Sequence, residues 1–188
     1  MQRNWRIFCH ETPIRSERRR LIDFIMIMIV IPDEEFRKEI SRYLKERNYE
    51  LSIPNHRQDV MNLVQKHQPN VIILDLFIAD PNGPTLLKNL RLQGCSGKII
   101  VISSASNRPV IGEVHQYHIE QVVSRSPTDP IRLLVDQIES TIRLLFRDPI
   151  SRKAYEHYLN RSCSHGNDWE DWFKAEKEIL KGHSLEHP

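Results

Sequence analysis

A single carboxylate ends the most apolar stretch of the chain. Residues 71–74 read Val-Ile-Ile-Leu, and Asp75 follows at once. An apolar run without alternation is typical of a strand that is buried on both faces of a parallel sheet. Because open α/β sheets bind their ligands at the carboxyl ends of the strands, Asp75 is a candidate binding or reactive group. The competing interpretation, a carboxylate that only caps a loop, stays open at this point.

Other reactive residue types form weaker candidates. The Cys-Ser-His run at 163–165, with His157 nearby, has the residue types of a metal site but not the spacing of four ligands. We expect this run to be ordinary loop, and His115 and His118 to be solvated. No Ser-His-Asp or Cys-His arrangement suggests nucleophilic catalysis, and no Gly/Ser/Thr-rich phosphate loop follows the first predicted strand.

Strand and helix patterns alternate five times around Asp75. The predicted strands are residues 21–31, 49–53, 71–75, 98–103 and 120–124. The predicted helices lie in residues 33–47, 60–64, 86–94, 107–118 and 129–146. Such an alternation predicts a doubly wound parallel α/β sheet with helices on both sides. Right-handed crossovers favour the strand order 2-1-3-4-5, which places strands one and three side by side at the centre.

Beyond residue 146 the pattern indicates a C-terminal helical pair. We interpret Asp148-Pro149 as the start of a new helix, because proline is common in the first turn. A second helix follows Gly166 and carries Trp169 and Trp172 on its apolar stripe. Such a pair is too small to fold well alone. We therefore expect the two tryptophans to pack against the first helix of the pair, the sheet domain or a partner.

Composition and charge suggest four parts. We divide the chain into a basic, flexible tail (1–20), a sheet domain (21–146), the helical pair (147–182) and a short tail (183–188). The net charge is +2, but the first tail holds six arginines and two glutamates. The tail could bind nucleic acid or anionic lipid, although a solvated end is the commoner role of such a segment.

Cysteine usage and hydropathy indicate where the protein works. The chain has three scattered cysteines, which fits a reducing compartment and not a disulfide framework. Its longest apolar run, residues 24–31, is far shorter than the roughly 20 residues that cross a bilayer. From the early charges and the lack of an apolar core in residues 1–11, we expect no secretion signal. We expect a cytoplasmic protein without a membrane partner.

Three features of the chain form one pattern: residues 72–76, Gly83 eight positions after the acid, and residues 101–104 at the end of the fourth strand. With this pattern, residues 23–146 resemble a response-regulator receiver domain, the switch module of bacterial two-component signalling. Residues 148–181 resemble a short bacterial helical domain of unknown function, which implies no activity.

The receiver resemblance implies three site residues. Asp75 falls on the phosphoacceptor position, Ser103 on the usual hydroxyl position, and Arg125 on the position that is normally lysine. A carboxylate nucleophile would accept the phosphoryl group from a phosphohistidine. Arg125 is expected either to bind phosphoryl oxygens or to form a salt bridge with Asp75 itself. Ser103 is expected either to donate to a phosphoryl oxygen or to cap the loop that follows it.

The resemblance also implies Mg²⁺ at this site. The expected ligands are Asp75 and the backbone carbonyl of Phe77, with Asp33 as a further candidate. The family has two adjacent acids at the end of the first strand, and this chain has Ile31 and Pro32 there. The departure weakens the metal site, because Mg²⁺ supplies charge stabilisation in phosphoryl transfer.

The implied function is a receiver in a phosphorelay. Its partners would be a sensor histidine kinase or phosphotransfer protein and a downstream protein that binds residues 120–145, with no metabolite turned over. The alternative is a degenerate receiver, an interaction module that works without phosphorylation. Ile31-Pro32 and Val122, which stands at the usual aromatic switch position, favour this alternative. Nucleic-acid association through residues 1–20 ranks last, because no DNA-reading domain is recognisable.

Overall fold

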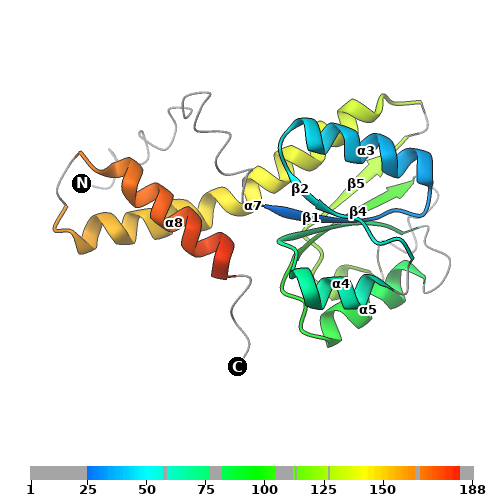
Figure 1. Cartoon of the computed structure of the whole chain (residues 1–188), viewed down its shortest axis with the longest axis horizontal. Helices are drawn as coiled ribbons and strands as arrows, with labels where there is room; N and C mark the ends of the chain where they lie inside the picture. The colour runs from blue at the N-terminus through cyan, green and yellow to red at the C-terminus, as the bar shows by residue number, and fades with distance from the viewer. Residues whose placement is uncertain are drawn as a thin grey trace.

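Five parallel strands form one sheet in the order β2-β1-β3-β4-β5 in the computed structural model. The structure describes residues 25–56, 59–76, 82–104, 112, 114–126, 128–163 and 166–182. The predicted fold class and strand order are confirmed, with β1 and β3 at the centre of the sheet (Figure 1).

The strands and the first three helices lie close to their predicted ranges, whereas α7 extends well beyond the predicted end. The strands are β1 Met26–Val30, β2 Glu50–Ser52, β3 Val71–Asp75, β4 Lys98–Ser104 and β5 Gln121–Arg125. The helices are α3 Glu34–Glu46, α4 Asp59–His67, α5 Gly83–Leu92, α7 Ile131–Asn160 and α8 Asp168–Gly182, with the 3-10 turn η2 at His115–Tyr117. Both predicted tails, the start of the first predicted strand and half of 107–118 lie outside the described residues.

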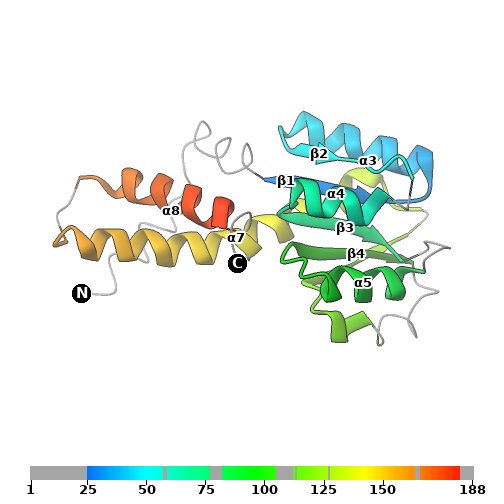
Figure 2. The ribbon, with the colours of Figure 1, turned by 60° about the horizontal axis from the view of Figure 1, so that its bottom comes forward.

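Helices cover both faces of the sheet. Val71 and Ile73 of β3 belong to the cluster under α3 and α7, whereas Ile72 and Leu74 belong to the cluster under α4 and α5. In the two views, α3 lies on one side of the sheet and α4 with α5 on the other (Figures 1 and 2). Because successive side chains of a strand point to opposite faces, burial on both sides requires the continuous apolar run that the sequence shows.

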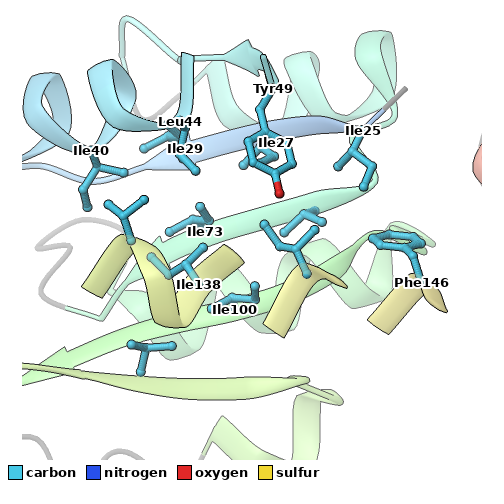
Figure 3. Close-up of a cluster of buried hydrophobic side chains, with 14 of the residues drawn as sticks. Ile25, Ile27, Ile29, Ile40, Leu44, Tyr49, Ile73, Ile100, Ile138 and Phe146 are labelled. Carbon is cyan, nitrogen blue, oxygen red and sulfur yellow. The ribbon is translucent and has the colours of Figure 1, made fainter. Parts of the chain in front are cut away.

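The cluster under α3 and α7 runs the full length of the sheet. Figure 3 shows Ile29 of β1, Ile73 of β3 and Ile100 of β4 with Ile138 of α7, and each of these side chains is 0% exposed. Burying a side chain of this size contributes about 1.5–3 kcal/mol. Phe146, further along α7, extends the same cluster to the amino edge of the strands.

The helix predicted to end near residue 146 continues without a break. α7 has 30 residues and contains Pro149, so the prediction of a new helix starting at Asp148-Pro149 is wrong. Its apolar stripe keeps a spacing of four residues through the proline, with the buried members Ile142, Phe146, Ile150 and Ala154. Burial along that stripe outweighs the roughly 3 kcal/mol that an internal proline costs a helix.

The boundary expected at residues 146–147 therefore lies inside α7, and the division into domains stays a prediction. At 1.5 Å per residue α7 is about 45 Å long, and Figures 1 and 2 show it leaving the sheet domain. Within the described residues, no helix combines the length and the apolar character that a membrane crossing needs.

The second helix of the pair runs back along α7. Ala175 and Leu180 of α8 are buried in the same cluster as Ile150 and Ala154 of α7. Trp172 packs against this cluster, as expected, whereas Trp169 is 40% exposed. We call α8 with the part of α7 that pairs with it the arm (Figure 2).

Ion pairs connect α7 and α8 at the end of the arm that is farther from the sheet. The Arg161 guanidinium donates to Asp171 Oδ2 at 2.8 Å and to Asp168 Oδ1 at 3.2 Å. The side chains of all three residues are mostly buried. Arg161 is the C-cap of α7, and the two acids lie in the first turn of α8, so this cluster joins the end of one helix to the start of the next.

Asn70 connects the last turns of α8 to the sheet through hydrogen bonds. Its side-chain Oδ1 accepts from the backbone N–H of Met26 at 2.8 Å, and its Nδ2 donates to the backbone carbonyl of Leu180 at 3.1 Å. The residue is only 4% exposed. One buried amide therefore joins the start of β1, the start of β3 and the last turns of α8.

Replacing Asn70 with alanine is expected to lower the free energy of unfolding by about 2–4 kcal/mol. The change leaves a partly buried N–H and a buried carbonyl without these partners, and a buried group left so costs about 1–3 kcal/mol. Urea unfolding measures the change, and amide hydrogen exchange should become faster in α8. Asn62→Ala, on an exposed position of α4, is the matched control and should change stability by less than about 0.5 kcal/mol. Equal stability of the two variants would contradict the role given to Asn70.

Candidate functional site

The predicted site residues lie at one edge of the sheet. Asp75 is the last residue of β3, Ser103 lies next to the end of β4, and Arg125 is the last residue of β5. These strands are parallel neighbours, so their carboxyl ends meet at the same edge. We call it the carboxyl edge.

The register sets the height of each residue at this edge. Asp75 pairs with Ile102 of β4, which in turn pairs with Val123 of β5. Ser103 is thus one residue, about 3 Å, beyond the level of Asp75, and Arg125 is two residues, about 7 Å, beyond it. Asp75 is 5% exposed and Ser103 is 1% exposed.

Strand alternation assigns these residues to faces. Asp75 shares its face with Val71 and Ile73, the face under α3 and α7, and Arg125 shares that face with Val123. Ser103 alternates to the face under α4 and α5. The three residues therefore share one edge of the sheet, but Ser103 lies on the opposite face from Asp75 and Arg125.

The ion pair of Arg125 is with Asp33 and not with Asp75. Its Nη2 lies 3.6 Å from Asp33 Oδ2, and its Cζ lies 3.6 Å from the centre of the Phe36 ring. A cation stacked on an aromatic face is stabilised by about 0.5–1 kcal/mol at exposed sites. Of the two roles predicted for Arg125, the salt bridge to Asp75 is therefore replaced by a contact with the first turn of α3.

Asp33 is engaged on both carboxylate oxygens. Its Oδ1 accepts from the backbone N–H of Phe36 at 3.1 Å and so caps α3. Its Oδ2 faces Arg125. The neighbouring acids Glu34 and Glu35 are paired with Lys38, at 2.8 and 3.6 Å. These three acids therefore stabilise the start of α3.

The end of β1 carries no acid. Ile31 is 3% exposed and belongs to the cluster under α3 and α7. Its backbone carbonyl accepts a hydrogen bond from Arg37 Nη1 at 3.0 Å. Sequence reasoning missed Arg37, because nothing in the local pattern indicates that a side chain from the first turns of α3 reaches back to the strand.

The described residues do not fit the metal site that the receiver resemblance implies. No group of three or more His, Cys, Asp or Glu that could hold a metal ion occurs among them. Mg²⁺ prefers carboxylate and other oxygen ligands in octahedral geometry, but Asp33 is occupied and Ile31 contributes only an apolar side chain. The backbone carbonyl predicted as a ligand, that of Phe77, lies outside the described residues.

The close approach of α5 to Leu76 requires a glycine at position 83. A Cβ on Gly83 would lie 2.9 Å from Leu76 Cδ2 and 3.0 Å from Leu76 Cα. The start of α5 therefore approaches the end of β3 more closely than any larger residue allows. This contact gives a physical reason for one residue on which the sequence resemblance depends.

The other sequence candidates form no metal-binding group among the residues that the structure describes. His157 Nε2 lies 3.2 Å from Glu178 Oε2, across the two helices of the arm. Cys163 is exposed, and Ser164 and His165 lie outside the described residues.

Two family models match the chain in separate segments. The model described as "Response regulator receiver domain" matches residues 27–136. The model described as "Protein of unknown function (DUF2934)" matches residues 147–181. The first match covers more than half of the chain and contains the whole carboxyl edge.

Curated relatives are regulators of similar type. The "Probable C4-dicarboxylate response regulator DctR" of Priestia megaterium is 24% identical over 132 residues, 68% of this chain and 56% of that protein. The "Transcriptional regulatory protein MalR" of Bacillus subtilis (strain 168) is 30% identical over 93 residues, 48% of this chain and 40% of that protein. This chain therefore spans about half the length of the curated relatives it matches.

Solved structures with the same fold are receiver domains. FixJ-N has a TM-score of 0.54 at 19% identity and covers 62% of this chain and 92% of its own. The BeF3-activated N-terminal receiver domain of Klebsiella pneumoniae RstA has a TM-score of 0.53 at 19% identity, with coverage of 63% and 98%. The receiver domain of the Francisella response regulator 1452 has a TM-score of 0.55 at 16% identity, with coverage of 64% and 98%.

Substitutions of Asp33 separate its two contacts. Asp33→Asn keeps an oxygen for the Phe36 N–H and removes the charge that faces Arg125. Because this ion pair is partly exposed, we expect the asparagine variant to lose less than about 1 kcal/mol of unfolding free energy. Asp33→Ala also removes the helix cap and should lose about 1 kcal/mol more. Urea unfolding checks both values, and equal losses in the two variants would show that capping by Asp33 is unimportant.

Proposed function

The chain belongs to the response regulator receiver domain family, and from this premise we propose that Asp75 accepts a phosphoryl group in two-component signalling. The donor would be a phosphohistidine on a sensor histidine kinase or phosphotransfer protein in the cytoplasm. The observation that carries the proposal is a 5% exposed carboxylate at the end of the central strand β3, with a hydroxyl and a guanidinium at the same edge.

The residues of the carboxyl edge suit an in-line transfer. An oxygen of Asp75 attacks phosphorus while the bond from phosphorus to the imidazole nitrogen breaks, and the electron pair leaves with the imidazole. Ser103 would donate its hydroxyl to a phosphoryl oxygen. Arg125 offers a planar fork of N–H donors that suits phosphate.

The signal would leave through Arg125. Its guanidinium holds the first turn of α3 through Asp33 and Phe36. A phosphoryl group on Asp75 would compete with Asp33 for these donors, which couples the chemical step to the end of β5. From β5 the chain leads directly into α7 and the arm. A downstream protein that binds β5 and α7 would therefore distinguish the two states.

A degenerate receiver is the second candidate function. The observation that favours it is the occupied carboxylate of Asp33 beside an apolar Ile31. In that case the fold would present β5, α7 and the arm to a partner without phosphorylation. Nucleic-acid binding through residues 1–20 concerns a segment outside the described residues.

Incubation with a small acyl phosphate and Mg²⁺ tests the proposal. We expect intact-mass analysis to find one added phosphoryl group on the wild-type chain and none on Asp75→Ala. The double variant Ile31→Asp with Pro32→Asp supplies two acids at the end of β1, and because Ile31 is buried, urea unfolding checks that this variant still folds. A double variant that reacts beside a wild type that does not would favour the degenerate receiver. An adduct that persists in Asp75→Ala would contradict the assignment of the acceptor.

A further inference from the structure

The end of α3 is attached to α7 through Arg47. This residue is the C-cap of α3, and its guanidinium donates from Nη2 to Asp136 Oδ1 at 2.6 Å and from Nε to Glu139 Oε2 at 2.8 Å. Its Nη1 donates to the Tyr43 carbonyl at 3.1 Å, so the side chain also stays bonded to its own helix. One guanidinium therefore joins the last turn of α3 to one face of α7.

This junction is mostly removed from water. The side chains of Arg47 and Glu139 are 22% and 15% exposed. Glu139 also accepts from Arg143 Nη2 at 2.6 Å, so its two carboxylate oxygens bind two different guanidiniums. Charge-assisted hydrogen bonds are stronger than neutral ones, and salt screens them less when they are partly buried. The junction therefore holds the end of α3 at one position on α7.

The start of α3 is attached to the segment that leads into the same helix. Arg125, the last residue of β5, pairs with Asp33 and stacks on Phe36. The chain then passes through residues 126–130 into α7. Asp33 and Arg47 are 14 positions apart, which corresponds to about 21 Å along a helix. The segment from β5 to the first turns of α7 therefore contacts α3 at both of its ends.

Between these two contacts α3 is a continuous helix that packs on the core. It has 13 residues, and Ile40 and Leu44 on its inner face are 0% exposed. Backbone hydrogen bonds fix the length of a helix, and close packing leaves its neighbours little free space. A displacement of the start of α3 is therefore carried to its end. The fold thus contains a connection from the carboxyl edge to α7 that does not follow the polypeptide from β5.

We propose that α3 couples the carboxyl edge to the arm, with Arg47 as the positioning residue that passes a displacement of α3 on to α7. Because α7 is uninterrupted over its 30 residues, a shift of its first turns continues into the arm. The inference goes beyond the proposed function, since it needs no phosphoryl group on Asp75. It applies equally to a receiver that works without phosphorylation.

Amide hydrogen exchange in a double-mutant cycle on the full chain tests the coupling. Arg125→Met removes the contacts at the start of α3, and Arg47→Met removes those at its end. We expect Arg125→Met alone to speed exchange about threefold or more in residues 135–142 of α7 and in α8. With Arg47→Met already present, adding Arg125→Met should change these rates by less than about 1.5-fold, because the connection through α3 is then already broken.

Two further variants of α3 serve as controls. Arg42 lies on an exposed position and pairs with Glu46 of the same helix at 3.3 Å. In place of Arg47→Met, the matched variant Arg42→Met should leave the effect of Arg125→Met unchanged. Arg47→Lys keeps the charge but has no fork of donors for two acids, so it should preserve only part of the effect. Urea unfolding checks that every variant is folded.

The side chain of Arg47 gives a second readout. In the nuclear magnetic resonance spectrum of the wild-type chain, its Nε–Hε group reports the bond to Glu139. We expect this resonance to shift in Arg125→Met, because the start of α3 has lost its contacts about 21 Å away. An unchanged resonance would show that no displacement reaches Arg47 and would contradict the inference.

Each result of the cycle supports or overturns a specific part of the proposal. An effect of Arg125→Met that is equal with and without Arg47 overturns the role of α3, because the change then follows the polypeptide from β5 to α7. No effect on α7 overturns the coupling as a whole. An effect on α7 that is absent from α8 overturns its extension to the arm. None of these results changes the adduct test on Asp75, so the proposed function is tested separately.

Discussion

Burial of the sheet on both faces is the constraint on which the rest of the molecule depends. The strands of the centre have no solvent-facing side, so their interior positions are apolar and polar groups collect where the strands end. Asp75 is the clearest case, since it follows four side chains that are 0% exposed and is itself 5% exposed. A carboxylate so close to the core is stable only with polar partners. The burial that forms the core therefore also leaves polar side chains such as Asp75 at the ends of the strands.

The same kind of burial explains why α7 passes through Pro149. An internal proline costs a helix roughly 3 kcal/mol. Phe146 and Ile150 are 1% and 0% exposed, and full burial of each contributes about 1.5–3 kcal/mol. The burial of these two side chains therefore exceeds the cost of the proline by a modest margin, which favours an uninterrupted helix. The arm is thus an extension of the last helix of the sheet domain, and its first half and second half share one hydrophobic stripe.

The parts of this structure that follow local patterns were predictable, and the parts that depend on distant contacts were not. The run from Val71 to Leu74 predicted a doubly buried strand, and the alternation of elements predicted the strand order. The helix start at Pro149 was mispredicted because a local proline signal was outweighed by burial against α8. The partners of Arg125 and Arg37 depend on how α3 lies over the sheet, which the sequence pattern does not give. Asn70 bonds a residue 110 positions away, and nothing in its neighbourhood indicates this partner.

The bond from Asn70 to the end of α8 has a mechanical consequence. A helix about 45 Å long that was attached to the sheet at only one end would be free to change its angle to the sheet. Here α8 is hydrogen-bonded to Asn70 at the amino edge of the strands, so α7 and α8 are both attached to the sheet. β3 has five residues. Asp75 is the last of them, and Asn70, which bonds α8, immediately precedes the first. This strand therefore connects the Asp75 carboxylate at one end to α8 at the other.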